Sequence, residues 1–200
     1  MPRPRKDDPQ SAAPAKIEAA FWQLLEDVGY SEITVRRVSQ ASGTNRNSFY
    51  YHYDSLEDLA RKAFLNNAEG ARPLISSLLA GFRVDITQGA RLDEKVIARA
   101  ERVMLCARSE SPFLTRMVNE LLRDTWFDEL GIAMDRMTQD DLAQAEFIFA
   151  GLVAVLGSSV AAESPLIVTH LANSRVGQAS IAALHDIAKA QAGGSTPALA

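Results

Sequence analysis

A run of nine residues in the first third of the chain, TNRNSFYYH from Thr44 to His52, consists almost entirely of side chains that form hydrogen bonds. It contains Arg46 and Asn47, the residue types that pair with the edges of guanine and adenine through two hydrogen bonds each. A helix that served packing alone would not need so many donors within two turns. The run therefore predicts a surface that contacts the major groove of duplex DNA.

The predicted DNA contacts differ in what they would touch. We expect Arg46 and Asn47 to contact bases, and Ser48 to contact a base or a phosphate. Thr34, Arg36 and Arg37 precede this run and are expected beside the DNA backbone. Tyr50, Tyr51 and His52 are expected to bind phosphate, and Thr44 and Asn45 at the start of the run are also expected to contact DNA. Core packing is the alternative for Tyr50 and Tyr51. Phe49 and Tyr53 are expected in the core, and no residue is expected to bind a metal.

The elements that must position these side chains are short helices. An apolar stripe at helical spacing predicts a first helix that ends at Gly29, formed by Ile17, Ala20, Phe21, Leu24, Leu25 and Val28. Thr34 is a good N-cap for a second helix through about Ser42, with Val35, Val38 and Ala41 turned inward. A turn at Gly43 and a third helix over 45–51, capped by Thr44 or Asn45, complete a helix-turn-helix. Ser55 and Asp58 open a fourth helix.

The stretch from Ile33 to Leu59, ITVRRVSQASGTNRNSFYYHYDSLEDL, resembles the DNA-binding segment of TetR-family transcriptional regulators. The resemblance is carried by the turn Ala41-Ser42-Gly43, the run FYYHY and the helix start SLEDL. It implies a homodimer that binds a palindromic DNA operator and is released by a small-molecule effector held among the middle helices. Leu56 stands where family members commonly carry Lys, so one phosphate contact is expected to be missing.

Composition and charge set limits on the function. Hydrophobic residues make up 47% and charged residues 23%, as in globular proteins. The net charge of −4 arises entirely beyond residue 66, because residues 1–66 hold nine basic and nine acidic side chains. Residues 34–53 contain three Arg and no acid, and screening over about 8–10 Å separates them from distant acids. Cys106 is the single cysteine, which excludes a disulfide framework and is typical of a cytoplasmic protein.

The whole chain is expected to be all-α, with about nine helices. We predict a disordered basic arm (1–14), a helix-turn-helix DNA-binding domain (15–54), a connecting helix (55–71), a ligand-binding and dimerisation domain (72–192) and a flexible tail (193–200). In the large domain, helices are predicted at about 72–83, 91–109, 112–129, 140–162 and 166–190. The apolar run 147–162 is too short for a membrane helix, which needs about 20 residues.

The two long helices near the C-terminus predict a dimer interface, because the first of them is apolar nearly all round. Two such helices from each subunit would form a four-helix interface. The expected interface residues are Phe149, Leu152, Val153, Leu156, Val160, Ile167, Leu171, Ser174, Gln178 and Ile181.

The middle helices are expected to hold the effector, and the residues predicted to bind it are Phe82, Met104, Met117, Glu120, Trp126 and Phe127. Ordinary core packing is the alternative for each. No cofactor is expected, and the chain lacks a nucleophile–His–acid set and a Gly-rich phosphate loop, so an enzyme is not expected. The competing function is an interaction module of the same fold that has lost DNA binding.

Overall fold

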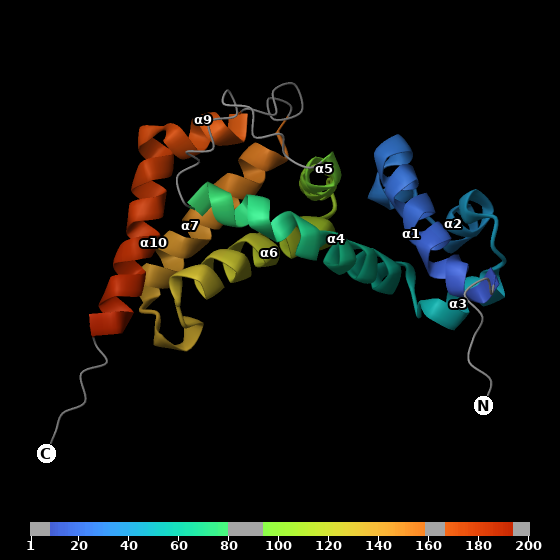
Figure 1. Ribbon diagram of the computed structural model, residues 1–200, viewed down its shortest axis with the longest axis horizontal. Helices are drawn as coiled ribbons and strands as arrows, with labels where there is room; N and C mark the ends of the chain where they lie inside the picture. Colours follow the sequence, from blue (N-terminus) through green and yellow to red (C-terminus); the bar gives the residue numbers. More distant parts are fainter. Residues whose placement is uncertain (1–8, 80–93, 159–166, 194–200) are drawn as a thin grey trace, which may run out of the picture.

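The computed structural model describes residues 9–79, 94–158 and 167–193. In this part of the chain it contains nine α-helices, two short 3₁₀ helices and no strand (Figure 1), so the all-α prediction is confirmed. The elements are α1 (Pro9–Val28), η1 (Tyr30–Glu32), α2 (Val35–Ser42), α3 (Arg46–His52), α4 (Leu56–Leu79), α5 (Glu94–Arg108), α6 (Pro112–Leu130), η3 (Met134–Arg136), α7 (Gln139–Leu156), α9 (Ile167–Asn173) and α10 (Arg175–Gly193).

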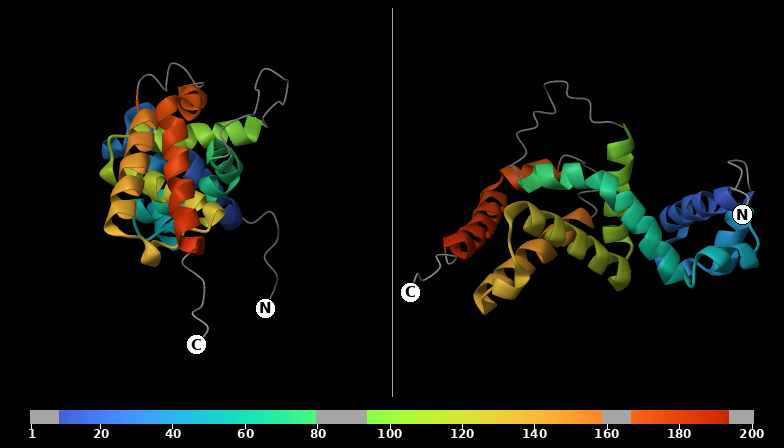
Figure 2. Two further views of the ribbon diagram at one scale, coloured as in Figure 1. Left: turned by 90° about the vertical axis from the view of Figure 1, so that its left-hand side faces the viewer. Right: turned by 60° about the horizontal axis from the view of Figure 1, so that its bottom comes forward.

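The helices form a head and a body that α4 connects. The head consists of α1, α2 and α3, and the body consists of α5 to α10 (Figure 1). The right-hand view in Figure 2 shows the same separation, with α4 leaving the head directly after α3 and running along α6. Among the described residues, no helix combines the length and the apolar content that a membrane span requires.

Caps and turns in the head agree with the sequence. Gly29 and Gly43 have φ of 76° and 65°, in the left-handed region that glycine adopts without strain. The side chain of Thr34 accepts a hydrogen bond from the backbone N–H of Arg37, and that of Asn45 accepts one from the N–H three residues on, at 3.2 and 2.8 Å. These contacts satisfy N–H groups that a helix start leaves free, and they fix α2 and α3 at the predicted places.

Two residues of the predicted apolar faces are exposed instead. Val28 is 41% exposed, and Ala41 lies on the surface of α2. Trp22 and Ser39, which the predicted apolar faces did not include, are buried instead, at 6% and 5% exposed. Trp22 is buried because its flank of α1 faces α5, a contact that helical periodicity alone does not reveal.

The connecting helix is longer than predicted. The expected break at Pro73 is wrong, because α4 continues through this residue to Leu79. A proline inside a helix removes one backbone hydrogen bond and bends the helix, and α4 bends along its length in Figures 1 and 2. Beyond the proline, the indole Nε1 of Trp126 donates to the carbonyl of Ile75 at 2.9 Å. This contact holds the end of α4 against α6.

Three other boundaries differ from the prediction. The disordered arm was expected through residue 14, but α1 begins at Pro9. α7 ends at Leu156, where an end near 162 was expected. The predicted helix 166–190 is divided into α9 and α10 at Ser174, whose hydroxyl accepts from the N–H of Gly177 at 3.1 Å and caps α10. The chain therefore changes direction between α9 and α10 (Figure 1).

Candidate nucleic-acid interface

One face of α3 is buried in the head and the other faces solvent. Phe49 and Tyr53 are 0% and 3% exposed, as predicted for the core. Tyr50 and Tyr51 are 57% and 74% exposed, so the core-packing alternative for their side chains does not apply. Arg46 and Asn47 lie on the exposed first turn of the same helix.

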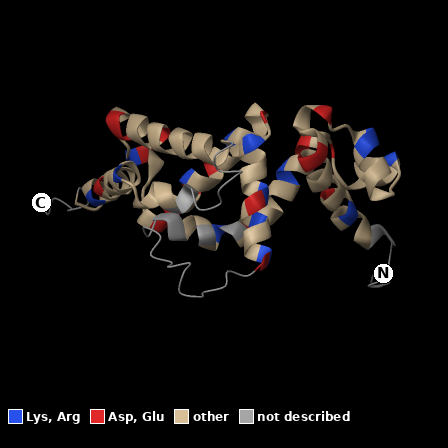
Figure 3. Ribbon diagram, turned by 90° about the horizontal axis from the view of Figure 1, so that it is seen from above, with Lys and Arg blue, Asp and Glu red and all other residues tan. Residues whose placement is uncertain are grey.

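The first turns of α2 and α3 contain basic residues and no acidic residue. That of α2 holds Arg36 and Arg37, and that of α3 begins with Arg46. A helix N-terminus is already positive through its dipole, so a cation there is unfavourable for the isolated helix and favourable for a bound anion. In Figure 3 basic residues mark the outer end of the head, whereas acidic residues lie nearer to the body. These cations would favour a bound polyanion, whereas they disfavour the two helices on which they lie.

Several of the polar side chains are already engaged within the head. The guanidinium of Arg37 donates to the carbonyl of Glu32 at 2.9 Å and pairs with its carboxylate at 3.4 Å. The hydroxyl of Thr44 shares a hydrogen bond with that of Ser42 at 2.8 Å. Within the described residues, the side chains of Arg36, Arg46 and Asn47 make no such bond, and these three are therefore available to a ligand.

The His52 side chain is partly buried. It was expected to contact phosphate, but its Nε2 is buried and has no hydrogen-bond partner among the described residues. Its backbone carbonyl accepts from Nζ of Lys62 at 3.2 Å. The residue therefore anchors the end of α3 to α4, and its Nε2 does not face a ligand.

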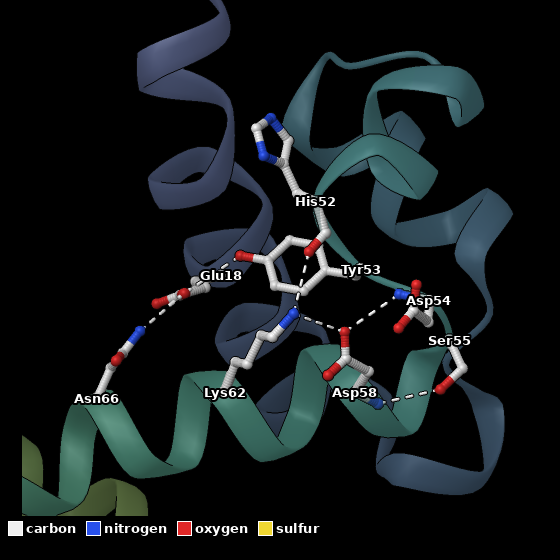
Figure 4. A network of polar contacts seen from close by, with 8 residues as sticks. All are labelled: Glu18, His52, Tyr53, Asp54, Ser55, Asp58, Lys62 and Asn66. Carbon is white, nitrogen blue, oxygen red and sulfur yellow. Dashed lines mark hydrogen bonds and ion pairs between the residues drawn. The ribbon is translucent and has the colours of Figure 1, made fainter.

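A polar network fastens the end of α3 to α1 and α4 (Figure 4). Oε1 of Glu18 accepts from the hydroxyl of Tyr53 at 3.2 Å and from the amide of Asn66 at 3.0 Å. Lys62 pairs with Asp58 at 2.8 Å, and this hydrogen bond lowers the pKa of the Asp58 carboxyl. Burial, followed by the charge of Glu18, raises the pKa of Tyr53. Of these contacts only the i,i+4 spacing of Asp58 and Lys62 leaves a signal in the sequence.

The start of α4 is acidic. Ser55 caps it by accepting from the N–H of Asp58 at 3.1 Å, as predicted, but the Asp58 carboxylate bonds the N–H of Asp54, one residue earlier than a capping box requires. Leu56 is half-buried and packs against the core. With Asp54, Glu57 and Asp58 around it, this helix start does not offer the cation that a phosphate contact would use.

The residues predicted to bind an effector have different surroundings in the described part of the chain. Met117, Trp126 and Phe127 are buried in the core of the body, and Met104 packs against that core. Glu120 lines a polar surface pocket instead. Phe82 lies outside the described residues.

An apolar groove of about 210 Å³ lies between α7 and α10, with Trp126 of α6 in its lining. The predicted interface residues Phe149, Val153 and Leu156 are buried beneath it, at 5% exposure or less, so their side chains are not free to meet a partner. Leu152, Leu171 and Ile181 line the groove. The hydroxyl of Ser174 caps α10, and Nε2 of Gln178 donates to the carbonyl of Ala172. Val160 lies outside the described residues, and the side chain of Ile167 is not described. The interface stays a prediction for Leu152, Leu171 and Ile181, which line the groove.

Residues 17–63 match the family model for bacterial regulatory proteins of the tetR family. The match covers the head from the middle of α1 onward and the first two turns of α4. A search of solved structures finds the TetR family repressor AlkX from Dietzia sp. strain DQ12-45-1b, implicated in biodegradation of n-alkanes, at 16% identity over 95% of this chain and 98% of that chain, with a TM-score of 0.34. No curated protein matches the chain. The family match coincides with the head and with the sequence resemblance.

Proposed function

We propose that this chain, whose residues 17–63 match the family model for tetR-family regulatory proteins, is a DNA-binding regulator that acts as a homodimeric repressor, binds a palindromic operator and is released by a small molecule. The observation that carries the DNA contact is the exposed first turn of α3. There Arg46 and Asn47 are unpaired within the described residues, on a helix whose other face is fixed by Phe49 and Tyr53. Both side chains fit base edges in the major groove.

The phosphate contacts that we propose are fewer than the sequence suggested. Arg36, Tyr50 and Tyr51 are exposed and face solvent, and the N–H groups at the start of α2 lie beside Arg36. Arg37 would contribute less to phosphate binding, because its guanidinium already pairs with the carboxylate of Glu32. Each neutralised phosphate adds about 0.9 to the slope of log affinity against log salt.

We place the dimer seam on the solvent side of α7 and α10. Phe147 is 77% exposed and Val176 is 65% exposed, and both border the apolar groove. Large apolar side chains gathered at one groove favour association, since covering them removes apolar area from water. Phe147→Asp or Val176→Asp should therefore yield monomers in sedimentation velocity, whereas Met134→Asp in η3, which is 48% exposed, serves as the matched control.

The effector that we propose is a small apolar molecule bound beneath this dimer seam, in the part of the groove that the buried Trp126 lines. Trp126 links the groove to the helix that carries the head, through its hydrogen bond to Ile75 at the end of α4. A ligand shifts DNA binding only by its differential affinity for two arrangements of the protein. In a screen of small apolar compounds for release of bound duplex, Trp126→Phe should bind the same compound but lose most of the release.

The experiment that tests DNA binding is selection of duplexes from a random pool by the full chain. The wild type should enrich a palindrome whose binding weakens steeply with salt. Arg46→Ala should relax the preference at one base position, at a cost of about 1–3 kcal/mol, and Tyr50→Phe should weaken all sequences similarly. Arg136→Ala, in η3 of the body, is the matched control.

Failure of every duplex to enrich would favour the interaction module instead. The acidic start of α4 and the half-buried Leu56 are the features that support that alternative. An unchanged affinity and base preference in Arg46→Ala would instead overturn the assignment of α3 to the groove.

A further inference from the structure

Two ring contacts join the head to body helices other than α4. The ring of Tyr30, in η1, stacks on Phe113 in the first turn of α6, with centroids 6.1 Å apart and planes inclined by 26°. The guanidinium of Arg61, on α4, lies 5.4 Å from the centroid of the same Phe113 ring. Phe113 is thus in contact with the head and with the connecting helix at once.

The second contact lies between α1 and α5. The guanidinium of Arg102 lies 5.3 Å from the centroid of the Trp22 ring, and Trp22 is 6% exposed. A cation over the face of an indole is an attractive arrangement that favours one orientation of the two groups. Burial and the nearby charge of Glu57 raise the pKa of the Tyr30 hydroxyl, in keeping with its enclosed place at the other contact.

These contacts constrain a movement that α4 alone leaves free. A head carried by one bent helix can swing about the bend, which displaces α3 because α3 lies at the start of α4, away from the body (Figure 1). Contacts to α5 and α6 on other sides of the head oppose such a swing. In a two-fold dimer the two α3 helices must lie one DNA turn apart, about 34–36 Å, or a multiple of it.

We infer that Phe113 with Tyr30 and Arg61, and Arg102 with Trp22, are positioning residues that set the orientation of the head and thereby the half-site spacing that the dimer accepts. This inference rests on the proposed function. The residues touch no base or phosphate. They act by keeping the second head at a high effective concentration over its half-site once the first is bound.

The first experiment measures head orientation without DNA. A spin label at Gln40→Cys, an exposed position on α2, reports the distance between the two heads, since Cys106 is buried and does not take up label. The native background should give one narrow distance distribution. Phe113→Ala and Arg102→Gln should each broaden it, and Arg116→Ala, an exposed residue further along α6, should leave it unchanged.

The second experiment repeats the duplex selection with the same variants. Phe113→Ala should lower affinity for the wild-type palindrome about 10-fold and accept several spacings, while the bases preferred within each half-site stay the same. If Phe113 only stabilised the fold, Phe113→Ala would lower the affinity without changing the half-site spacing that the dimer accepts. Circular dichroism confirms folding, and Arg102→Gln, a surface change, keeps the test decisive if Phe113→Ala unfolds.

The outcomes separate the two proposals. A wild type that enriches no palindrome overturns the proposed function. A wild type that enriches a palindrome of fixed spacing, with both variants keeping that spacing and the narrow distance distribution, overturns the positioning role alone.

Discussion

The hydroxyl of Tyr53 donates to Oε1 of Glu18 at 3.2 Å, which joins the residue after α3 to the first helix of the head across 35 positions of sequence. Because Tyr53 is also 3% exposed, the end of α3 is fixed by a ring in the core and a hydroxyl at its edge. The exposed first turn of α3 is therefore presented by a helix that cannot rotate about its axis without breaking this bond.

We predict that Tyr53→Phe lowers the free energy of unfolding by about 1 kcal/mol, the usual net value of one hydrogen bond. The ring remains in place, and Glu18 still accepts from Asn66. Urea unfolding followed by circular dichroism measures the change. Tyr51→Phe, at a position 74% exposed, is the control and should be neutral; equal losses in the two variants would show that the Glu18 contact contributes nothing.

Arg46 should lower the stability of the helix on which it lies. It occupies the first position of α3, where a cation opposes the helix dipole. Arg46→Glu should therefore raise the free energy of unfolding by about 0.3–1 kcal/mol at low salt and abolish binding to the selected duplex. Thermal unfolding and a binding titration test the two effects, and a loss of both stability and binding would contradict the functional reading of this arginine.

The Cys106 thiol should be inert in the folded protein. It is fully buried, and burial raises its pKa from 9.0 to about 12. Only the thiolate reacts readily, so a disulfide reagent at pH 8 should label the native chain far more slowly than the unfolded chain.

The raised pKa of Cys106 also sets the sign of a pH dependence. The folded chain holds this proton more tightly than the unfolded chain, so the thiol contributes stability in full below pH 9 and loses it as the pH rises toward 12. Cys106→Ala should flatten the fall in unfolding free energy over that range. An unchanged slope would show that the thiol does not contribute to alkaline unfolding.

Two glycines in the C-terminal helices should respond in opposite ways to alanine. A Cβ at Gly177 would collide with the backbone carbonyl of Leu171, whereas one at Gly151 would meet no atom within 4 Å. Gly177→Ala should cost about 1–3 kcal/mol through overpacking, and Gly151→Ala should be neutral or stabilising for the isolated subunit, because alanine favours a helix. Denaturant unfolding at low protein concentration compares them.

Local features of the head could be predicted from the sequence because each depends on residues a few positions apart. Thr34 and Asn45 cap their helices through N–H groups three residues on, and Gly43 adopts a positive φ that few other residues accept. The exposure of Arg46 and the burial of Phe49 follow from the same short helix. The all-α class follows from periodicity.

Longer-range features required the tertiary structure, because they depend on which helix packs against which. Sequence periodicity showed that α7 is apolar nearly all round, but only packing against Trp126 and Phe127 decided that Phe149 faces inward and Phe147 faces solvent. The same holds for Glu18, whose partners Tyr53 and Asn66 lie 35 and 48 residues away. Spacing along a helix determines which side chains share a face, whereas the neighbouring helices determine which face is covered.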